Sequence, residues 1–193
     1  MDTKYWIIDD KLIFKPEFNE ELEEYYNVIG KYNTLIFSNY DDPEITIKTD
    51  NKYEDRNYKN YKKSKFNKEI KLTKNITNLS FGKYFNQKIE LTENITDLRF
   101  GNDFNQEIKL TENITNLSFG MYFNKKTRLA KNLTLRNNRK IINYVTNQVE
   151  NLKFLNYEKK IKINNLPNSI KTIEIDNKKI KIRKQIEAKI EFI

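Results

Sequence analysis

The sequence predicts a mainly β solenoid whose coils of about 19–22 residues stack on one another. The first observation is a Phe-Asn pair that recurs every 19 residues, at Phe66, Phe85, Phe104 and Phe123. The second is that each repeat contains two short stretches in which apolar and polar residues alternate, which is typical of strands. The third is the length of the repeat, because a helix of ten residues would leave too little chain for the rest of a coil. We therefore expect about six coils.

Two strands per coil are expected from the two alternating stretches. The first stretch is Ile70–Leu72, and the second is Leu79–Phe81; both recur 19 and 38 residues later. Stacked coils of this kind pair as parallel strands about 4.8 Å apart. Equal positions of successive repeats should therefore form interior columns, such as the column of Phe81, Phe100 and Phe119.

Glycine and asparagine hold fixed positions in the repeat. Three of the four glycines follow the second stretch directly, at Gly82, Gly101 and Gly120. Glycine adopts positive φ without a Cβ penalty, so we expect positive φ at these positions. The Asn after each repeated Phe is expected to bond the turn backbone of its own coil and of the next.

The ends of the chain look like caps, and four segments are predicted. Residues 1–46 form an N-terminal cap and a degenerate first coil, and residues 47–65 form a polar loop. Residues 66–176 form the repeat solenoid, and residues 177–193 form a basic capping strand. The N-terminal cap combines a strand or hairpin over 5–14 with a helix over 15–31, where Pro and early acidic residues precede a late Gly30. Terminal units of a solenoid must shield its open core.

The composition argues against an enzyme. The chain has no Cys and no His, which excludes disulfides, thiolate and His-ligated metal sites, and catalysis by His. Its four glycines form no phosphate-binding loop. We therefore predict no enzymatic activity, no cofactor and no metal. No apolar run approaches the length of a membrane span and no signal segment opens the chain, so no membrane association and a cytoplasmic location are predicted.

Positive charge is concentrated at the C-terminal end of the chain. Residues 1–65 contain 11 Lys and Arg against 14 Asp and Glu, residues 66–123 contain 7 against 7, and residues 124–193 contain 18 against 6. Such asymmetry suggests an anionic partner, and basic clusters can bind nucleic-acid phosphates. The candidate residues for nucleic acid are Lys125, Lys126, Arg128, Lys131, Arg136, Arg139 and Lys140.

Outward positions on the second stretch are the candidate contacts for a protein partner, because a repeat solenoid usually binds through such a face. Arg is enriched among residues that dominate binding energy, so Arg99 is the first candidate anchor. The alternative for Arg99 is a solvated side chain paired with Asp97. The full set of candidates is Asn78, Ser80, Asp97, Arg99, Asn116, Ser118, Asn151 and Lys153.

The repeated motif resembles the FNIP repeat, a relative of the leucine-rich repeat. Residues 75–89 carry the L-x-F-G-x-x-F-N portion of its pattern, and "LPNSI" at residues 166–170 is close to its opening. The resemblance implies a leucine-rich-repeat-like solenoid and protein binding. Such proteins are typical of giant DNA viruses of amoebae and of social amoebae, which would place a viral chain in the host cytoplasm or the virion.

The predicted function is a non-enzymatic scaffold for protein–protein interaction, such as a viral protein that engages a host or viral partner. The first alternative is a factor that binds RNA or DNA through the basic C-terminal third. The second is a substrate receptor of a ubiquitin ligase, since many FNIP-repeat proteins carry an N-terminal F-box. The segment before residue 33 does not read as an F-box. The sequence leaves the identity of the partner and the oligomeric state open.

Overall fold

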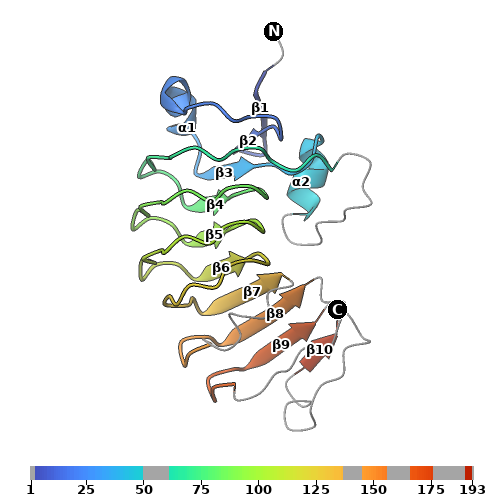
Figure 1. Cartoon of the computed structure of the whole chain (residues 1–193), viewed down its shortest axis with the longest axis vertical. Coiled ribbons are helices and arrows are strands. Elements are labelled where there is room, and N and C mark those ends of the chain that lie inside the picture. The colour runs from blue at the N-terminus through green and yellow to red at the C-terminus, as the bar shows by residue number, and fades with distance from the viewer. Residues whose placement is uncertain (1–2, 50–60, 137–144, 156–165, 176–189, 193) are drawn as a thin grey trace.

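A computed structural model describes residues 3–49, 61–136, 145–155, 166–175 and 190–192. In these residues ten strands form one sheet whose spatial order follows the chain (Figure 1). β1 is antiparallel to β2, and every later pair is parallel. The strands are β1 (Tyr5–Ile8), β2 (Lys11–Phe14), β3 (Thr34–Phe37), β4 (Asn78–Ser80), β5 (Asp97–Arg99), β6 (Asn116–Phe119), β7 (Asn132–Arg136), β8 (Asn151–Leu155), β9 (Thr172–Ile175) and β10 (Ile190–Phe192).

The predicted mainly β solenoid is confirmed, with more coils than expected. β4, β5 and β6 pair residue by residue at the 19-residue spacing, as in Leu79 with Leu98 and Leu98 with Leu117. β2 and β10 lie in segments that the sequence assigns to caps, yet both join the parallel part of the sheet. The stack of coils is therefore longer at both ends than the sequence suggests.

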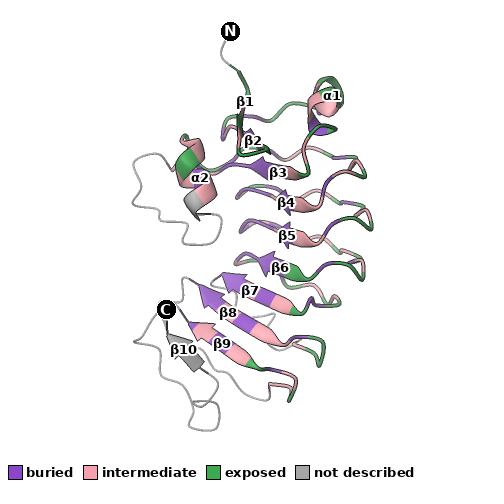
Figure 2. Cartoon of the chain, turned by 180° about the vertical axis from the view of Figure 1, so that it is seen from behind, coloured by how far each residue is buried: buried purple, intermediate pink, exposed green. Residues whose placement is uncertain are grey.

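Two columns of stacked Phe rings run through the core. Within a coil, the two Phe residues that bracket Gly-x-x stack with centroids 3.7 Å apart, as in Phe81 with Phe85 and Phe100 with Phe104. Between coils, Phe81 and Phe100 lie 5.6 Å apart with their planes 8° from parallel. Buried residues alternate with partly exposed ones along the strands (Figure 2). Each ring therefore contacts its own coil and the next, so no coil can bury its apolar side alone.

The same ring pair occurs twice before Phe81. Phe14 stacks on Phe18 at 4.2 Å, and Phe37 stacks on Phe66 at 3.9 Å. Phe37 and Phe66 are thus the two Phe positions of one coil, and residues 38–65 are inserted between them. β2 likewise opens a coil of the repeat type, although the sequence assigns it to a hairpin cap. Ring stacking reveals the relationship, whereas the inserted residues hide it in the sequence.

The helices are short. The helix expected over 15–31 is only a 3-10 turn, η1 (Glu23–Tyr25), followed by one α-helical turn, α1 (Tyr26–Ile29). Leu22 and Ile29 are buried, and the Tyr25 ring packs edge-on against Phe14 and Phe18, so the segment does cover the end of the core. Burial and a hydrogen bond to Glu20 raise the pKa of Tyr25 to about 12, so the hydroxyl remains a donor at neutral pH.

A further helix, α2 (Pro43–Thr49), lies beside the end of β3 and was not predicted. It occupies part of the segment expected to be a polar loop. Its start has a clear signal, because Asp42 Oδ1 accepts the backbone N–H groups of Glu44 and Ile45 and Pro43 takes the first helical position. None of the helices in the described residues is long and apolar enough to cross a membrane.

The expectation of a second strand in each coil is wrong. Ile70–Leu72 and its two copies have no strand conformation, and no backbone hydrogen bond joins these stretches to one another in the described residues. Ile70, Ile89 and Leu110 are nevertheless buried. In each copy the alternation therefore reflects one apolar side chain that points inward from irregular backbone. A period-two pattern over only three residues does not distinguish this arrangement from a strand.

The expectation of positive φ at the repeated glycines is also wrong, since no described Gly has positive φ. Glycine is required at these positions because the backbone of the preceding coil lies too close for a side chain. A Cβ on Gly101 would lie 2.0 Å from the carbonyl oxygen of Gly82, and one on Gly120 would lie 2.4 Å from that of Gly101. The glycines of successive coils lie against one another, so the coils approach at this corner more closely than any side chain permits.

The asparagines that follow the second Phe of each coil form a ladder along one corner of the solenoid. The side-chain oxygen of Asn67 accepts the backbone N–H of Asn86 at 2.8 Å, and Asn86 and Asn105 repeat the contact with the next coil. Asn19 begins the series by accepting the N–H of Asn67 at 2.9 Å. The predicted structural role is confirmed for the contact to the next coil.

Candidate partner-binding face

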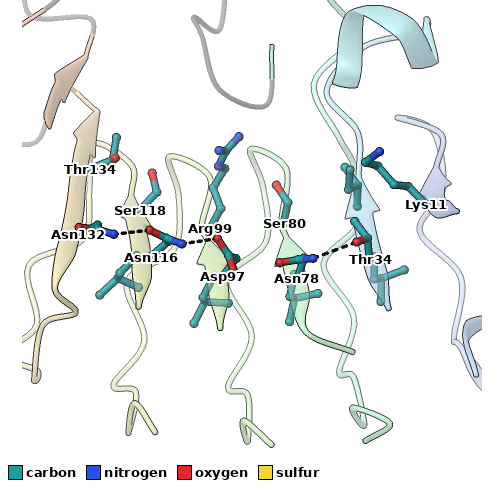
Figure 3. A pocket seen from close by; sticks show the side chains of 15 residues that line it. Lys11, Thr34, Asn78, Ser80, Asp97, Arg99, Asn116, Ser118, Asn132 and Thr134 are labelled. Carbon is teal, nitrogen blue, oxygen red and sulfur yellow. Dashed lines mark hydrogen bonds between the residues drawn. The ribbon is translucent and has the colours of Figure 1, made fainter. Parts of the chain in front are cut away.

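The face of the sheet turned away from the Phe columns carries a hollow of about 400 Å³ (Figure 3). It extends across β2 to β7, and we call it the outer-face hollow. Polar side chains at alternate strand positions line it, because residues i and i+2 of a strand point to the same side. Besides Ile36 and four leucines of the core, its lining residues are Lys11, Thr34, Asn78, Ser80, Asp97, Arg99, Asn116, Ser118, Asn132 and Thr134.

Six of the eight candidate contacts for a protein line this hollow. The other two, Asn151 and Lys153, lie at corresponding positions on β8, beyond the hollow. Lys153 pairs with Glu174 of β9 at 2.8 Å. The structure therefore places all eight residues on the face that the alternation predicts, and it leaves their role as binding residues a prediction.

Several of these side chains are committed to one another in a row of hydrogen bonds along the sheet. Asn116 donates to Asp97 at 2.6 Å, Asn132 donates to Asn116 at 2.7 Å, and Asn151 donates to Asn132 at 2.7 Å. Thr172 donates to Asn151 at 2.8 Å and is the last member of the row in the described residues. These amides stabilise the stack, and their capacity to bind a partner is correspondingly reduced.

Asp97 interrupts the row. The side-chain amide of Asn78 donates to Thr34 at 3.1 Å, and an ionised Asp97 offers its neighbour Asn78 no donor. The two carboxylate oxygens of Asp97 accept instead from Asn116 and from the hydroxyl of Thr96, the latter at 2.7 Å. The rung between β4 and β5 therefore presents two acceptors to each other.

We expect Asp97→Asn to stabilise the protein, because the new amide can donate to the side-chain oxygen of Asn78 while still accepting from Asn116. Thr96 keeps a partner in the carbonyl of Thr77, as Thr115 does in the next coil with that of Thr96. One added neutral hydrogen bond is worth about 0.5–1.5 kcal/mol. Thermal unfolding followed by circular dichroism should show a melting temperature higher by a few degrees, and a lower one would contradict the proposed rung.

Arg99 lies in the middle of the hollow and extends away from Asp97 and Asn116 (Figure 3). Ser118 lies beside it on β6 but is only 6% exposed. Its hydroxyl accepts a hydrogen bond from the Nε of Arg136 at 3.4 Å. The centre of this face therefore presents the long, charged side chain of Arg99, next to a Ser118 hydroxyl that is nearly inaccessible.

The basic residues proposed for nucleic acid do not form one exposed cluster in the described residues. Arg136 is 7% exposed, and its side chain turns from the end of β7 toward Ser118, so little of it is accessible to a phosphate. Its role in nucleic-acid binding stays a prediction. Arg128 pairs with Glu112 at 2.9 Å and Lys131 with Glu150 at 3.4 Å. Lys125 is half-buried, Lys126 is exposed, and Arg139 and Lys140 lie outside the described residues.

Sequence reasoning missed four lining residues, which are Lys11, Thr34, Asn132 and Thr134. The sequence contains a signal for Thr34, Asn132 and Thr134. The stretches around 33–37 and 133–135 resemble the second stretch of the repeat, and alternation predicts that the polar residues beside their apolar ones point outward. Lys11 had no such signal, because β2 reads as part of a hairpin. The described residues contain no group of three Asp, Glu, His or Cys side chains that could hold a metal ion.

A known family of repeats matches part of the chain. The family model of the FNIP repeat matches residues 66–90, 85–111 and 137–178. These parts of the chain carry FNIP repeats. The first two matches cover coils whose Phe pairs stack regularly, and the third covers a region that departs from the 19-residue period. The FNIP-like coil at Phe14 and Phe18 lies outside these matches and is evident from the stacking alone.

Among solved structures, the chain is similar to CroV588, described as a novel circular LRR protein. The two share 23% sequence identity at a TM-score of 0.45, and the similarity covers 90% of this chain and 31% of that one. The chain thus spans less than a third of the length of that protein. No match is found among the curated proteins.

Proposed function

We propose that this FNIP-repeat solenoid is a non-enzymatic scaffold that binds a protein partner through the outer-face hollow. The observation that carries the proposal is the hollow itself, which brings six residues from three successive coils, with Arg99 at its centre, onto one face. A segment of a partner laid across the strands would contact several coils at once. The row of amides holds this face rigid, so little conformational entropy is lost on binding.

The partner should present a carboxylate or several carbonyl oxygens to Arg99, because a guanidinium offers five donors in a planar fork. Asn, Ser and Thr side chains around it supply weaker polar contacts. The expected setting is the cytoplasm of the source cell, or the host cytoplasm or virion for a viral chain.

Affinity capture from a lysate of the source cell tests the proposal, with wild-type chain, Arg99→Glu and the control Lys74→Glu side by side. Lys74 is exposed in a turn and does not line the hollow. Lys74→Glu changes the net charge of the protein by the same amount as Arg99→Glu. We expect a discrete protein to remain bound to wild type and to the control after nuclease treatment and at moderate salt. Arg99→Glu should weaken this binding at least about tenfold, as loss of an interface hot spot does.

Other outcomes of the same capture would favour other functions. Loss of the bound material after nuclease treatment, or its steep loss with salt, would indicate nucleic-acid binding. Co-purification of ubiquitin-ligase core subunits would indicate a substrate receptor. Equal capture by Arg99→Glu and wild type would exclude the outer-face hollow as the binding site.

A further inference from the structure

A column of three side chains lies on the turns that follow β4, β5 and β6. The second turn residue is Tyr84 in the first of these coils, Asp103 in the next and Tyr122 in the third. The turns are stacked in register, because the N–H of Asp103 donates to the carbonyl of Lys83 and that of Tyr122 to the carbonyl of Asn102, both at 3.0 Å. The three side chains therefore leave successive coils at the same position, and we call them the Tyr–Asp–Tyr column.

Both rings of the column are unusually exposed. Tyr84 is 38% exposed and Tyr122 is 56% exposed. Within the described residues, only Ile7 joins them as a large exposed apolar side chain. Single exposed apolar residues are ordinary, whereas two in one column suggest a contact surface. The position does not require an aromatic residue for stacking, since Asp103 occupies it in the coil between.

The spacing of the column suits a cation. Coils stack about 4.8 Å apart, so rings two coils apart are separated by about 9.6 Å, and a group midway between them would lie about 4.8 Å from each. That distance is within the roughly 6 Å over which a cation interacts with an aromatic face. Asp103 belongs to the coil between those of the two tyrosines, so the column also supplies a carboxylate. The Nζ of Lys83 is 5.2 Å from the centroid of the Tyr84 ring, so a cation already reaches one of them.

We propose that the Tyr–Asp–Tyr column is a second binding site, which takes an arginine side chain of a partner protein. The planar guanidinium can insert between the two rings while its N–H groups pair with Asp103. The site lies at the edge toward which β4 to β6 run, and none of its residues lines the outer-face hollow. It goes beyond the function proposed above and does not rest on it.

The probe is the peptide acetyl-Gly-Arg-Gly-amide, titrated into isotopically labelled full-length chain and followed by NMR. We expect saturable shifts of the backbone amides of Tyr84, Asp103 and Tyr122, and no shifts with acetyl-Gly-Gln-Gly-amide. Tyr122→Phe keeps an aromatic face and should retain the affinity. Tyr122→Leu and Asp103→Asn should each weaken it about two- to fivefold, in line with one exposed cation–π contact or one surface ion pair.

Glu90→Gln is the control, because Glu90 is an exposed carboxylate that lies outside the column. The affinity of this variant for the arginine peptide should equal that of wild type. All four substitutions are at solvent-accessible positions, and a spectrum with unchanged dispersion verifies that each variant is folded. The proposal is overturned by the absence of saturable shifts with the arginine peptide. It is equally overturned by Tyr122→Leu binding as well as wild type, which would reduce the site to the charge of Asp103.

Discussion

Gly101→Ala should destabilise the solenoid by about 3 kcal/mol or more, at or above the upper end of the usual penalty for overpacking. The added Cβ would lie 2.0 Å from the carbonyl oxygen of Gly82, 2.5 Å from its carbonyl carbon and 2.8 Å from the Cα of Lys83. All three are backbone atoms of the preceding coil. Relief therefore requires the two coils to separate, which also weakens the ladder hydrogen bonds between β4 and β5.

Gly30→Ala is the matched control for this substitution. Gly30 ends α1 with φ −62°, and an added Cβ there would meet only the carbonyl oxygen of Tyr26 at 3.3 Å. We expect its free energy of unfolding to stay within about 1 kcal/mol of wild type, since Ala also restricts the unfolded chain. Urea denaturation followed by circular dichroism measures both variants. Similar stability of Gly101→Ala and Gly30→Ala would contradict the close approach of the coils.

Phe100→Ala should cost about 3–5 kcal/mol, the usual range for truncation of a fully buried aromatic residue. Phe100 is 1% exposed, stacks on Phe104 at 3.7 Å, and lies between Phe81 and Phe119 at 5.6 and 5.7 Å. Removing its ring opens a cavity in the centre of the column, where chain on both sides prevents collapse. Since typical domains are stable by only 5–15 kcal/mol, the loss should be evident as a large fall in melting temperature.

The control for Phe100→Ala is Ile7→Ala, which removes an apolar side chain that is 49% exposed and should change stability by less than about 1 kcal/mol. Hydrogen exchange adds a second readout, because a break at the central coil should expose amides of β4, β5 and β6 first. A melting temperature of Phe100→Ala equal to that of Ile7→Ala would refute the placement of Phe100 in the core column.

The sequence was sufficient to predict the coil length, the parallel stacking and the outward face. Identical residues recur at one spacing, so placing Leu79 on Leu98 and Leu117 satisfies every apolar position at once, and no other register does. The same logic identified six residues of the hollow. It did not identify Lys11, nor the repeat that begins at Phe14, because the residues inserted between Phe37 and Phe66 separate that part of the chain from the regular 19-residue period.

The misassigned features share a physical cause. A repeated Gly is compatible with positive φ and with close approach, and only the position of the neighbouring coil distinguishes them. A three-residue alternation is compatible with a strand and with an inward-pointing side chain on irregular backbone. In both cases the deciding quantity is a distance between coils, which a single copy of the repeat does not contain.

The sequence by itself determined the solenoid, because its period specifies which side chains lie above one another and which must be buried. Tertiary structure decided what the polar residues do. It commits Asn116, Asn132 and Asn151 to one another, buries Arg136 against Ser118, and leaves Arg99 in the hollow and Asp103 in the coil between those of two exposed tyrosines. Burial follows from hydrophobic pattern along the chain, whereas the pairing of a polar side chain depends on which donor or acceptor the next coil brings within about 3 Å.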